Sequence, residues 1–353
     1  MKLQLRRVGV PTPGARDARR GWAERESVLV QLSDPNGPRG VGEASPLPGY
    51  SPESLDAVEA ALGALDPARV AEPLEGSPAR AALAAVAALV PGHLPSARMA
   101  LETAALDLLG QRQGVAAPEL LGAQPGARRP AAQLLGPASL PELLTASERA
   151  LRAGYRHLKL KLGAPGQLEA ELNGVEAVRA RHGDGVALRL DANGALDSSA
   201  LERAWLRLAS LGIELFEEPG ALPLSLRGVL PLALDESLQG LDPASALTLL
   251  SERQARYAVL KPMALGGLSH CWSLAERAHA VGITPLLSHC FDGPFAWRAA
   301  AALALALPAS GAHGLAPHAG LQGWTLREPL AEDGSIHAWN SPGLGSPAET
   351  SFQ

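Results

Sequence analysis

The sequence predicts a parallel α/β barrel preceded by a smaller α+β domain, and three observations lead to this prediction. From about residue 131 onward, short apolar runs alternate with helix-length amphipathic segments, which is the rhythm of repeated βα units. The first 125 residues lack this rhythm and indicate a short antiparallel meander followed by helices. Between the two parts lies a stretch rich in Gly, Pro and Ala, residues 122–130, that is typical of a domain boundary.

The first domain, residues 1–125, is expected to begin with strands and continue with helices. The predicted strands are 3–10, 27–32 and 40–44, with a turn at 34–37. Ser51 is a candidate N-cap and Pro52 a candidate first helical residue, so that a helix continues from Ser54. Two further helices are predicted at 79–90 and 96–113. The C-terminal tail, from about 325 to 353, is a candidate to pack back on this domain.

The second domain, residues 126–324, contains eight short apolar runs that predict parallel strands. They are 131–135, 157–162, 187–190, 213–216, 232–234, 257–260, 283–287 and 312–315. The predicted helices between most of them are 167–181, 198–210, 243–253, 268–280 and 295–307. Eight strands with helical crossovers fit a closed (β/α)7β barrel. An open doubly wound sheet is the alternative. Such a sheet typically has a glycine-rich phosphate-binding turn after its first strand, and this sequence has no such turn there.

Composition and charge exclude several classes of protein. The net charge of −5 argues against nucleic acid or an anionic membrane as the main partner, and 4% aromatic residues are too few for a base-stacking surface. The apolar runs are too short to cross a bilayer, and the N-terminus lacks the apolar core of a signal peptide. Two cysteines, Cys271 and Cys290, predict free thiols in a reducing compartment. We therefore expect a cytoplasmic protein that acts on a small molecule, and its oligomeric state stays open.

Three successive barrel strands run into carboxylates, in the segments LRLDANG, ELFEEPG and LALDESL. Their polar residues are Asp191, Asn193, Glu217, Glu218, Asp235 and Glu236. Carboxylates that converge at one barrel mouth repel one another unless a cation joins them, and oxygen donors without His or Cys favour Mg²⁺, or Mn²⁺, over Zn²⁺. For each segment alone, an ordinary acidic N-cap or turn is the alternative interpretation.

Lysines mark two further strands. Lys159 and Lys161 in HLKLKLG are two residues apart, so both lie on one face of a strand, and in a barrel without edges that face is the interior. Lys261 in YAVLKPM ends the sixth strand, well around the ring. A carboxylate substrate at the centre would therefore have lysines on opposite sides. We expect partial burial and a nearby cation to lower a lysine pKa toward a value useful for proton abstraction.

The order KLK, DANG, FEEP, LDES and VLKP on consecutive strands resembles the muconate-lactonizing-enzyme subgroup of the enolase superfamily. The match covers residues 131 to about 320, and the resemblance implies a TIM-like barrel with an N-terminal α+β capping domain. It also implies that Mg²⁺ is held by Asp191, Glu217 and Asp235, with Asn193, Glu218 and Glu236 behind these ligands. The catalytic residues implied are Lys161 as acid and base, Lys159 as its electrostatic support, and Lys261 on the opposite side of the substrate.

Within this subgroup, the segment GVGEASPLPGYSPES resembles the o-succinylbenzoate synthases of menaquinone biosynthesis, which are carbon–oxygen lyases. The implied reaction dehydrates a succinyl-hydroxycyclohexadiene carboxylate to o-succinylbenzoate through an enediolate. In the implied syn elimination, Lys161 removes the α-proton and then protonates the departing hydroxide, while Lys261 stabilises the intermediate. Residues 47–51 and 11–22 of the capping domain are expected to close over the substrate.

The residues that contact the substrate are predicted with less support from motifs. The candidates are Pro48, Tyr50, Ser288, His289 and Asp292. The last three lie in LLSHCFDGPFA, which is not the serine-rich loop of many o-succinylbenzoate synthases, so they either reach a distal carboxylate or cap the next helix. For His313 and His318 a structural role is preferred to lining the mouth, and Cys290 is interpreted as incidental.

Other activities remain open at this point. A dipeptide epimerase or N-acylamino acid racemase uses the same geometry of two lysines, with deprotonation on one face and reprotonation on the other. A muconate-type cycloisomerase is a third possibility. The alternative of another class is a barrel that binds a small carboxylate without catalysis.

Overall fold

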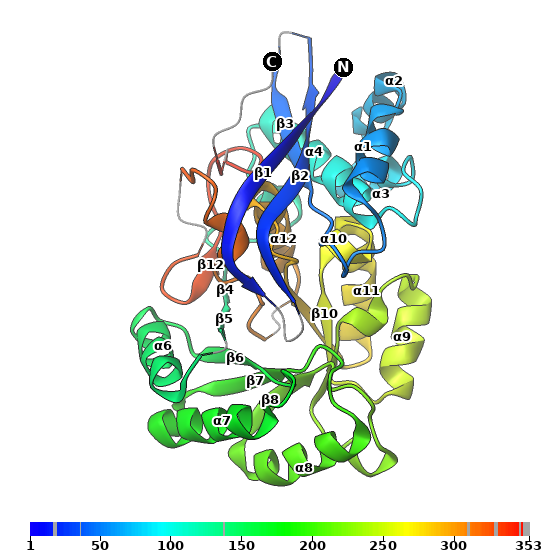
Figure 1. Ribbon diagram of the computed structural model, residues 1–353. Helices are drawn as coiled ribbons and strands as arrows, with labels where there is room; N and C mark the ends of the chain where they lie inside the picture. Colours follow the sequence, from blue (N-terminus) through cyan, green and yellow to red (C-terminus); the bar gives the residue numbers. More distant parts are fainter. Residues whose placement is uncertain are drawn as a thin grey trace.

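The computed structural model of the chain describes residues 1–16, 20–35, 37–136, 138–308, 311–327, 331–345 and 347–348. Figure 1 shows an N-terminal part, with a long two-stranded ribbon and a cluster of helices, lying against a curled sheet that is wrapped by helices on its outside. The predicted fold class, a barrel of parallel strands with an N-terminal α+β part, is confirmed.

The N-terminal part contains an antiparallel sheet of the order β1-β2-β3, as the sequence predicts. Its strands are β1 (Lys2–Arg16), β2 (Gly21–Ser33) and β3 (Arg39–Ala44). Its helices are α1 (Leu55–Gly63), α2 (Pro67–Ala71), α3 (Ala79–Ala87), α4 (Pro95–Gln113) and α5 (Ala117–Leu120). The glycines of β3 allow α4 to lie directly on the sheet, because a Cβ at Gly42 would be 1.9 Å from the Ala100 carbonyl oxygen.

The predicted start of the first helix was wrong by three residues. Ser54, not Ser51, caps α1, with its hydroxyl accepting from the Ala57 amide at 3.2 Å. The Ser51 hydroxyl instead accepts from the Leu47 amide at 2.9 Å and closes the turn before the helix. Of the turn predicted at 34–37, residue 36 lies outside the described residues.

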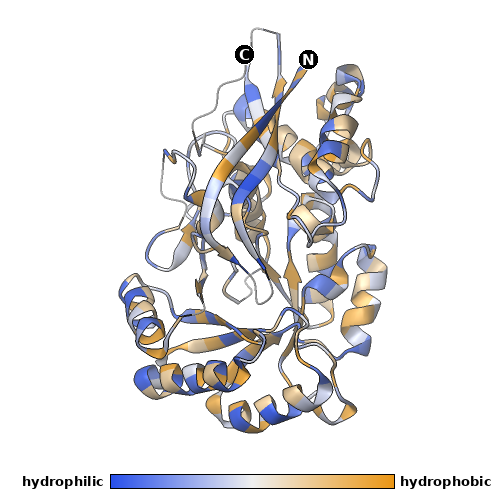
Figure 2. Cartoon of the chain, viewed as in Figure 1, coloured by the Kyte–Doolittle hydropathy of each residue, from blue (hydrophilic) through white to orange (hydrophobic). Residues whose placement is uncertain are grey.

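The barrel sheet has seven parallel strands in sequence order, from β5 to β11. They are β5 (Ala132–Leu135), β6 (His157–Lys161), β7 (Ala187–Asp191), β8 (Ile213–Glu217), β9 (Leu232–Leu234), β10 (Tyr257–Leu260) and β11 (Thr284–Leu287). The principal helices around it are α6 (Leu140–Arg152), α7 (Leu168–His182), α8 (Ser198–Leu208), α9 (Pro243–Glu252), α10 (Pro262–Leu265), α11 (Leu268–Ala280) and α12 (Pro294–Ala306). Figure 2 shows hydrophilic and hydrophobic residues alternating along the outer helices α6, α7 and α8.

The eighth predicted strand, 312–315, is present only as two single bridges. His313 pairs with Ala131 beside β5, and Gly314 pairs with Ser288 beside β11. The segment therefore touches both edges of the seven-stranded sheet and closes the ring. It forms too few backbone hydrogen bonds with its neighbours to be a regular strand. None of the helices in the described ranges combines the length and hydropathy needed to cross a membrane.

The C-terminal tail returns to both parts of the molecule. Strand β12 (Ser335–His337) pairs antiparallel with β4 (Arg128–Pro130), which lies inside the stretch predicted to be a boundary. Further on, the Leu344 amide donates to Asp107 of α4 at 2.8 Å. Residues 328–330, 346 and 349–353 of the predicted tail lie outside the described residues.

Two fully buried carboxylates of the N-terminal part bind backbone amides at the start of barrel helices. Glu43 of β3 accepts from the Gly293 amide at 2.7 Å, just before α12. Glu102 of α4 accepts from the Leu268 amide and, at 3.1 Å, from the Ser269 amide at the start of α11. Burial raises the pKa of Glu102 to about 7. Because both carboxylates satisfy orphan helix amides, they fix the N-terminal part over the mouth of the barrel.

Candidate active site

The charged residues that the sequence places at strand ends meet at the carboxyl end of the barrel sheet. Register pairs Lys161 of β6 with Asp191 of β7, and Asp191 with Glu217 of β8. Asp235 follows β9 directly, and Lys261 follows β10. Four of these five side chains are buried, and Lys161 is partly buried. The three carboxylates therefore stand on neighbouring strands at one end of the ring.

Two lysines of β6 pair with the first two carboxylates. The Lys159 ammonium lies 2.8 Å from an Asp191 oxygen and 2.7 Å from each Glu217 oxygen. The Lys161 ammonium lies 2.6 Å from the same Asp191 oxygen and 2.8 Å from the Asn193 amide oxygen. Lys159 thus lies between two carboxylates, while Lys161 is held by one carboxylate and one amide.

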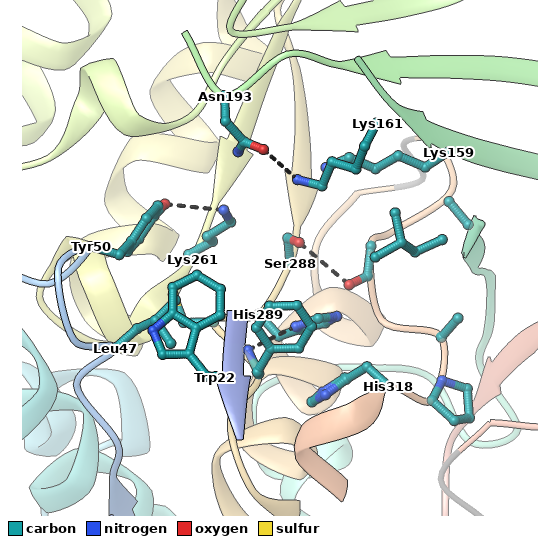
Figure 3. A pocket seen from close by; sticks show the side chains of 17 residues that line it. Trp22, Leu47, Tyr50, Lys159, Lys161, Asn193, Lys261, Ser288, His289 and His318 are labelled. Carbon is teal, nitrogen blue, oxygen red and sulfur yellow. Dashed lines mark hydrogen bonds between the residues drawn. The ribbon is translucent and has the colours of Figure 1, made fainter. Parts of the chain in front are cut away.

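The third lysine approaches from the other side. Lys261 is bonded to Asp235, and its ammonium also donates to the Tyr50 hydroxyl at 3.0 Å. The same hydroxyl donates to the other Asp235 oxygen at 3.1 Å. Figure 3 shows Lys159 and Lys161 together on one side of the cavity and Lys261 beside Tyr50 on the other. The lysines predicted on opposite flanks are therefore found there.

Burial alone does not lower the pKa of Lys159 or Lys261, and the lowering expected from burial together with a nearby cation stays a prediction. Burial opposes the positive charge of Lys159, but Asp191 and Glu217 outweigh it and raise the Lys159 pKa. Burial likewise opposes the charge of Lys261, and Asp235 raises the Lys261 pKa well above its ordinary value. Burial also raises the pKa of Asp235, with Lys261 opposing that rise. At these short distances each ammonium is stabilised by its carboxylate more than it is penalised by desolvation.

Behind the carboxylates, three further predicted residues hold the strand ends in place. Glu218 accepts from the backbone amides of Asp235 and Ser237, both at 2.8 Å. One Glu236 oxygen accepts from the Asn193 side-chain amide at 2.8 Å, and its other oxygen is buried without a partner among the described residues. Asn193 and Glu218 both have left-handed backbone, with φ of 44° and 37°. Such conformations are uncommon for residues other than glycine and concentrate at functional sites.

The three carboxylates at the mouth of the barrel are the kind of ligands that a hard divalent cation prefers. Asp191, Glu217 and Asp235 offer only oxygen atoms and are all buried, and no His or Cys stands among them. In the part of the chain that the structure describes, no three such side chains are close enough together to surround one ion as they stand. Instead the lysine ammonium groups supply the positive charge that buried carboxylates require.

A small cavity of about 70 Å³ opens between these groups and the N-terminal part. Of the predicted substrate contacts, Tyr50, Ser288 and His289 line it, together with Trp22 and Leu47 from the predicted covering segments. Residues 17–19 of the second covering segment lie outside the described residues. Typical ligand pockets are several times larger than this cavity.

Two predicted contacts do not line the cavity. Pro48 is exposed, and its carbonyl accepts from the Trp22 indole at 3.1 Å. Asp292 is buried and accepts from the Cys290 amide at 3.2 Å. Asp292 does not cap α12 either, since Glu43 binds the first amide of that turn. Cys290 itself is a free, buried thiol in the cavity wall.

The two histidines near the eighth segment separate into different roles. His313 is fully buried, and its Nδ1 accepts from the Leu287 amide at 3.0 Å, which is the structural role that the sequence favoured. His318 lines the cavity, contrary to the preferred interpretation. The sequence carried no signal for this, because His318 reaches the cavity through a loop rather than a strand end.

The distribution of lysine along the chain is a further sequence signal for this site. Of the 31 Lys and Arg residues in the chain, only four are lysines, namely Lys2, Lys159, Lys161 and Lys261. Three of these four line the cavity, whereas every other Lys or Arg in the chain except Lys2 is an arginine. Arginine does not release a proton in proteins and lysine does, so this concentration of lysine points to proton transfer.

Comparison with known proteins agrees with this geometry. Residues 142–349 match the family "Enolase C-terminal domain-like", and residues 3–122 match "Mandelate racemase / muconate lactonizing enzyme, N-terminal domain". Muconate cycloisomerase 1-1 of Acinetobacter lwoffii is 32% identical over 78% of this chain and 74% of its own length. The L-Lys-D/L-Arg epimerase of Methylococcus capsulatus is 31% identical over 97% of both chains. An o-succinylbenzoate synthase of Desulfotalea psychrophila is 28% identical over 80% of this chain and 84% of its own.

Solved structures of the same kind superpose on nearly the whole chain. The muconate lactonizing enzyme from Pseudomonas fluorescens, complexed with muconolactone, gives a TM-score of 0.83 at 27% identity, over 99% of this chain and 96% of that one. A dipeptide epimerase from Methylococcus capsulatus, complexed with Mg ion, gives 0.77 at 28% identity, over 98% of both chains.

Proposed function

This chain belongs to the enolase superfamily, in its muconate-lactonizing-enzyme subgroup, and from that premise we propose that it is an enzyme that removes the α-proton of a carboxylate substrate and eliminates water. The specific reaction proposed is dehydration of a succinyl-hydroxycyclohexadiene carboxylate to o-succinylbenzoate. The observation that carries this proposal is the pair of lysine groups, Lys159 with Lys161 and Lys261 with Tyr50, on opposite sides of one cavity.

Members of the enolase superfamily bind Mg²⁺, and we propose the same for this chain. The residues that would hold the ion are Asp191, Glu217 and Asp235, whose buried oxygen atoms suit a hard cation. When bound, the ion stabilises the negative charge that develops on the substrate carboxylate as the α-proton leaves. Glu218 supports this set indirectly, because it holds the backbone at Asp235.

The proton steps are assigned to Lys161. In its neutral form Lys161 takes the α-proton, so that the C–H electron pair becomes available for the new C=C bond. The C–O bond then breaks, and the Lys161 ammonium gives its proton to the leaving hydroxide, which departs as water. Hydrogen bonds from Lys161 to Asp191 and Asn193 set the direction of its ammonium group. Lys261 contributes positive charge from the other side without transferring a proton.

The lining of the cavity supports an anionic substrate. Three ammonium groups face it, and no Asp or Glu is among the described residues that line it. A dipeptide with a free ammonium group would find no carboxylate on this lining, whereas the carboxylates of a dicarboxylate would find hydrogen-bond donors there. This observation favours dehydration of the succinyl compound over epimerisation of an unblocked dipeptide.

A second candidate is racemisation of an N-acylamino acid. Its support is the same two-sided arrangement of Lys161 and Lys261, since deprotonation on one face and reprotonation on the other need a lysine on each. An acylated nitrogen carries no charge, so the lining does not oppose this substrate.

The test is a spectrophotometric dehydration assay of the whole protein with the hydroxycyclohexadiene substrate, in Mg²⁺ and again with an excess of chelator. With Mg²⁺ we expect the long-wavelength ultraviolet band of the conjugated diene to disappear as the aromatic ring forms, and with chelator we expect no change. Turnover that ignores the chelator would remove the metal from the proposal. No turnover, together with deuterium uptake from D₂O at the α-carbon of an N-acylamino acid, would replace dehydration with racemisation.

The cavity of about 70 Å³ is too small to admit such a substrate, so the residues that cover it must move for the substrate to enter. Trp22, Leu47 and Tyr50 cover the mouth from the N-terminal part, and the indole of Trp22 is tied to the Pro48 carbonyl. We propose that this cover opens for substrate entry and product release and excludes water when closed.

A further inference from the structure

Two histidines stack on each other in the wall of the cavity, away from the lysines. His289 follows β11, and His318 comes from the segment after the closing bridges. Their ring centroids are 3.6 Å apart and their planes are 24° from parallel. Both rings line the cavity, and Figure 3 shows them together on the side facing away from Lys161. The proposed mechanism assigns neither of them a role.

The hydrogen bonds of both rings fix which nitrogen carries the proton. His289 Nδ1 accepts from the Phe291 amide at 3.1 Å, and His318 Nδ1 accepts from the Gly320 amide at 3.2 Å. In a neutral imidazole the other nitrogen is then the donor, so each ring offers an Nε2–H group. His318 Nε2 is buried and has no partner among the described residues. A buried donor without an acceptor is costly, and a ligand that supplies the acceptor relieves the cost.

Both rings stay neutral donors at neutral pH. Burial, with Arg25 adding to it, lowers the pKa of His318 to about 3. Burial and the neighbouring His318 lower the pKa of His289 well below its ordinary value. Two neutral rings can stack without charge repulsion, and each then presents a single N–H group of fixed direction.

The loop that carries His289 is held in place by local contacts. Phe291 has a left-handed φ of 56°, and the Asp292 carboxylate accepts from the Cys290 amide. The segment of His318 packs closely against this loop, since a Cβ at Gly320 would lie 2.1 Å from the Phe291 carbonyl oxygen. Residue 320 must therefore be glycine for the two rings to meet. A site with this much local support is organised before a ligand arrives.

The surroundings of the pair define what it can receive. The Phe291 ring lies 5.5 Å from His289 and 5.9 Å from Trp22, so the donors sit beside an aromatic wall. No carboxylate lines the cavity in the described part of the chain to compete for the two N–H groups. His318 and Phe291 also line a neighbouring cavity of about 550 Å³, which leaves room on this side for the end of a longer molecule.

We propose that the Nε2–H groups of His289 and His318 form a distal subsite that binds a second carboxylate of the substrate. The inference rests on the proposed function and deepens it, because it names the two side chains that receive the second carboxylate of the proposed substrate. One carboxylate lies among the lysines, and the other reaches the histidine pair along the aromatic wall. The pair determines specificity, whereas the lysines carry out the chemistry.

The test compares two ligands that differ only at the distal group. The probes are o-succinylbenzoate and 2-butanoylbenzoate, in which a methyl group replaces the distal carboxylate, and binding to the whole protein is measured by calorimetry with Mg²⁺ present. We expect the dicarboxylate to bind about 10- to 100-fold more tightly, the range for hydrogen bonds to a charged group. The H318F substitution, which keeps a ring but removes the donor, should abolish most of this preference and leave binding of 2-butanoylbenzoate nearly unchanged.

H289F should act in the same direction, and H93F, at an exposed histidine, serves as the matched control and should keep the full preference. Equal binding of the two ligands by the unsubstituted protein would overturn the proposal, and so would an unchanged preference in folded H318F. If neither variant folds, imidazole ¹⁵N shifts of the unsubstituted protein decide. The Nε2 signals should move with o-succinylbenzoate and not with 2-butanoylbenzoate, and no selective movement would overturn the subsite.

The outcomes for the subsite and for the proposed reaction can be told apart. A histidine-dependent preference without dehydration keeps the subsite and removes the reaction. Dehydration without any preference for the dicarboxylate keeps the reaction and removes the subsite.

Discussion

The barrel contains two charge networks, one at its mouth and one at its floor, and they are built differently. At the mouth, lysines pair with Asp191, Glu217 and Asp235. At the floor, Arg189 of β7 makes two bonds to Glu214 of β8, at 2.7 and 2.8 Å, and a third to the Ala312 carbonyl. His157 completes the floor at 2.8 Å from Glu214.

The difference between them lies in the cation. The Arg189 guanidinium is planar and permanently charged, so its forked contact with Glu214 suits a fixed plug at the closed end of the barrel. Lysine ammonium groups are compact, can lose a proton and make contacts of variable direction. Charged groups lose water at both ends, but the lysines of the mouth line the cavity, where they can exchange protons with a ligand. The comparison assigns chemistry to the mouth and stability to the floor.

The largest effect is expected at the mouth. The K161R substitution keeps the positive charge beside Asp191 and Asn193 but removes the base, so turnover should fall by about 10²- to 10⁴-fold. The change is read as kcat at saturating substrate, with the unfolding midpoint as a check on the fold. K2R, at the lysine remote from the cavity, is the matched control and should keep its activity. Full activity of K161R would remove Lys161 from the proton steps.

At the floor the expected effect is on stability. E214Q leaves the buried Arg189 without its counter-charge and should lower the free energy of unfolding by about 3 kcal/mol. Urea unfolding measures this change. E148Q, which breaks an exposed pair with Arg181, should lower it by less than about 1 kcal/mol. If E214Q changed kcat as strongly as K161R does, the division between mouth and floor would be wrong.

The contribution of Glu214 to the free energy of unfolding should depend on pH. Arg189 and His157 outweigh the effect of burial and hold the pKa of Glu214 at about 2, below its ordinary value of 4.5. A carboxyl group whose pKa is lower in the folded protein than in the unfolded chain stabilises the fold at pH values above its unfolded pKa. This stabilisation is lost as the pH falls through the pKa of the folded state. The difference in unfolding free energy between the unsubstituted protein and E214Q should therefore be complete above pH 5 and shrink as the pH falls toward 2. A difference independent of pH would contradict this assignment.

The smallest expected effect is that of Mg²⁺ on thermal stability. An ion held only by the folded mouth adds about 2.7 kcal/mol at a hundredfold excess over its dissociation constant, which raises the unfolding midpoint by several degrees. D191N should abolish this rise, and E214Q should preserve it despite a lower starting midpoint. A rise that survives D191N would put the ion elsewhere.

The strands of the barrel and the charged residues at its mouth could be predicted from the sequence. Strands such as β9 and β10 coincide with the predicted runs, because an apolar run between turn residues defines a buried parallel strand locally. The mouth was predictable because charged residues such as Asp191 and Lys261 end those runs. The eighth strand was overestimated, since its pairing depends on how the ring closes and not on its own residues.

The floor and the junction between the two parts could not be predicted. Arg189 and Glu214 appear in the sequence as polar residues inside apolar runs, and nothing local says that they meet through a register shift between β7 and β8. Glu43 finds its amide partner 250 residues away. Phe291 and His318 come from loops, whose conformation is set by contacts such as the one that requires Gly320. In each case the partner is defined only by the folded chain.

The most direct test of the central claim is a crystal structure of the protein grown with Mn²⁺, with the ion located by its anomalous signal. We expect one ion bonded to an oxygen from each of Asp191, Glu217 and Asp235, with Lys161 and Lys261 on opposite sides of it. An ion bound elsewhere, or three carboxylates still paired with lysines and pointing to separate places, would contradict it.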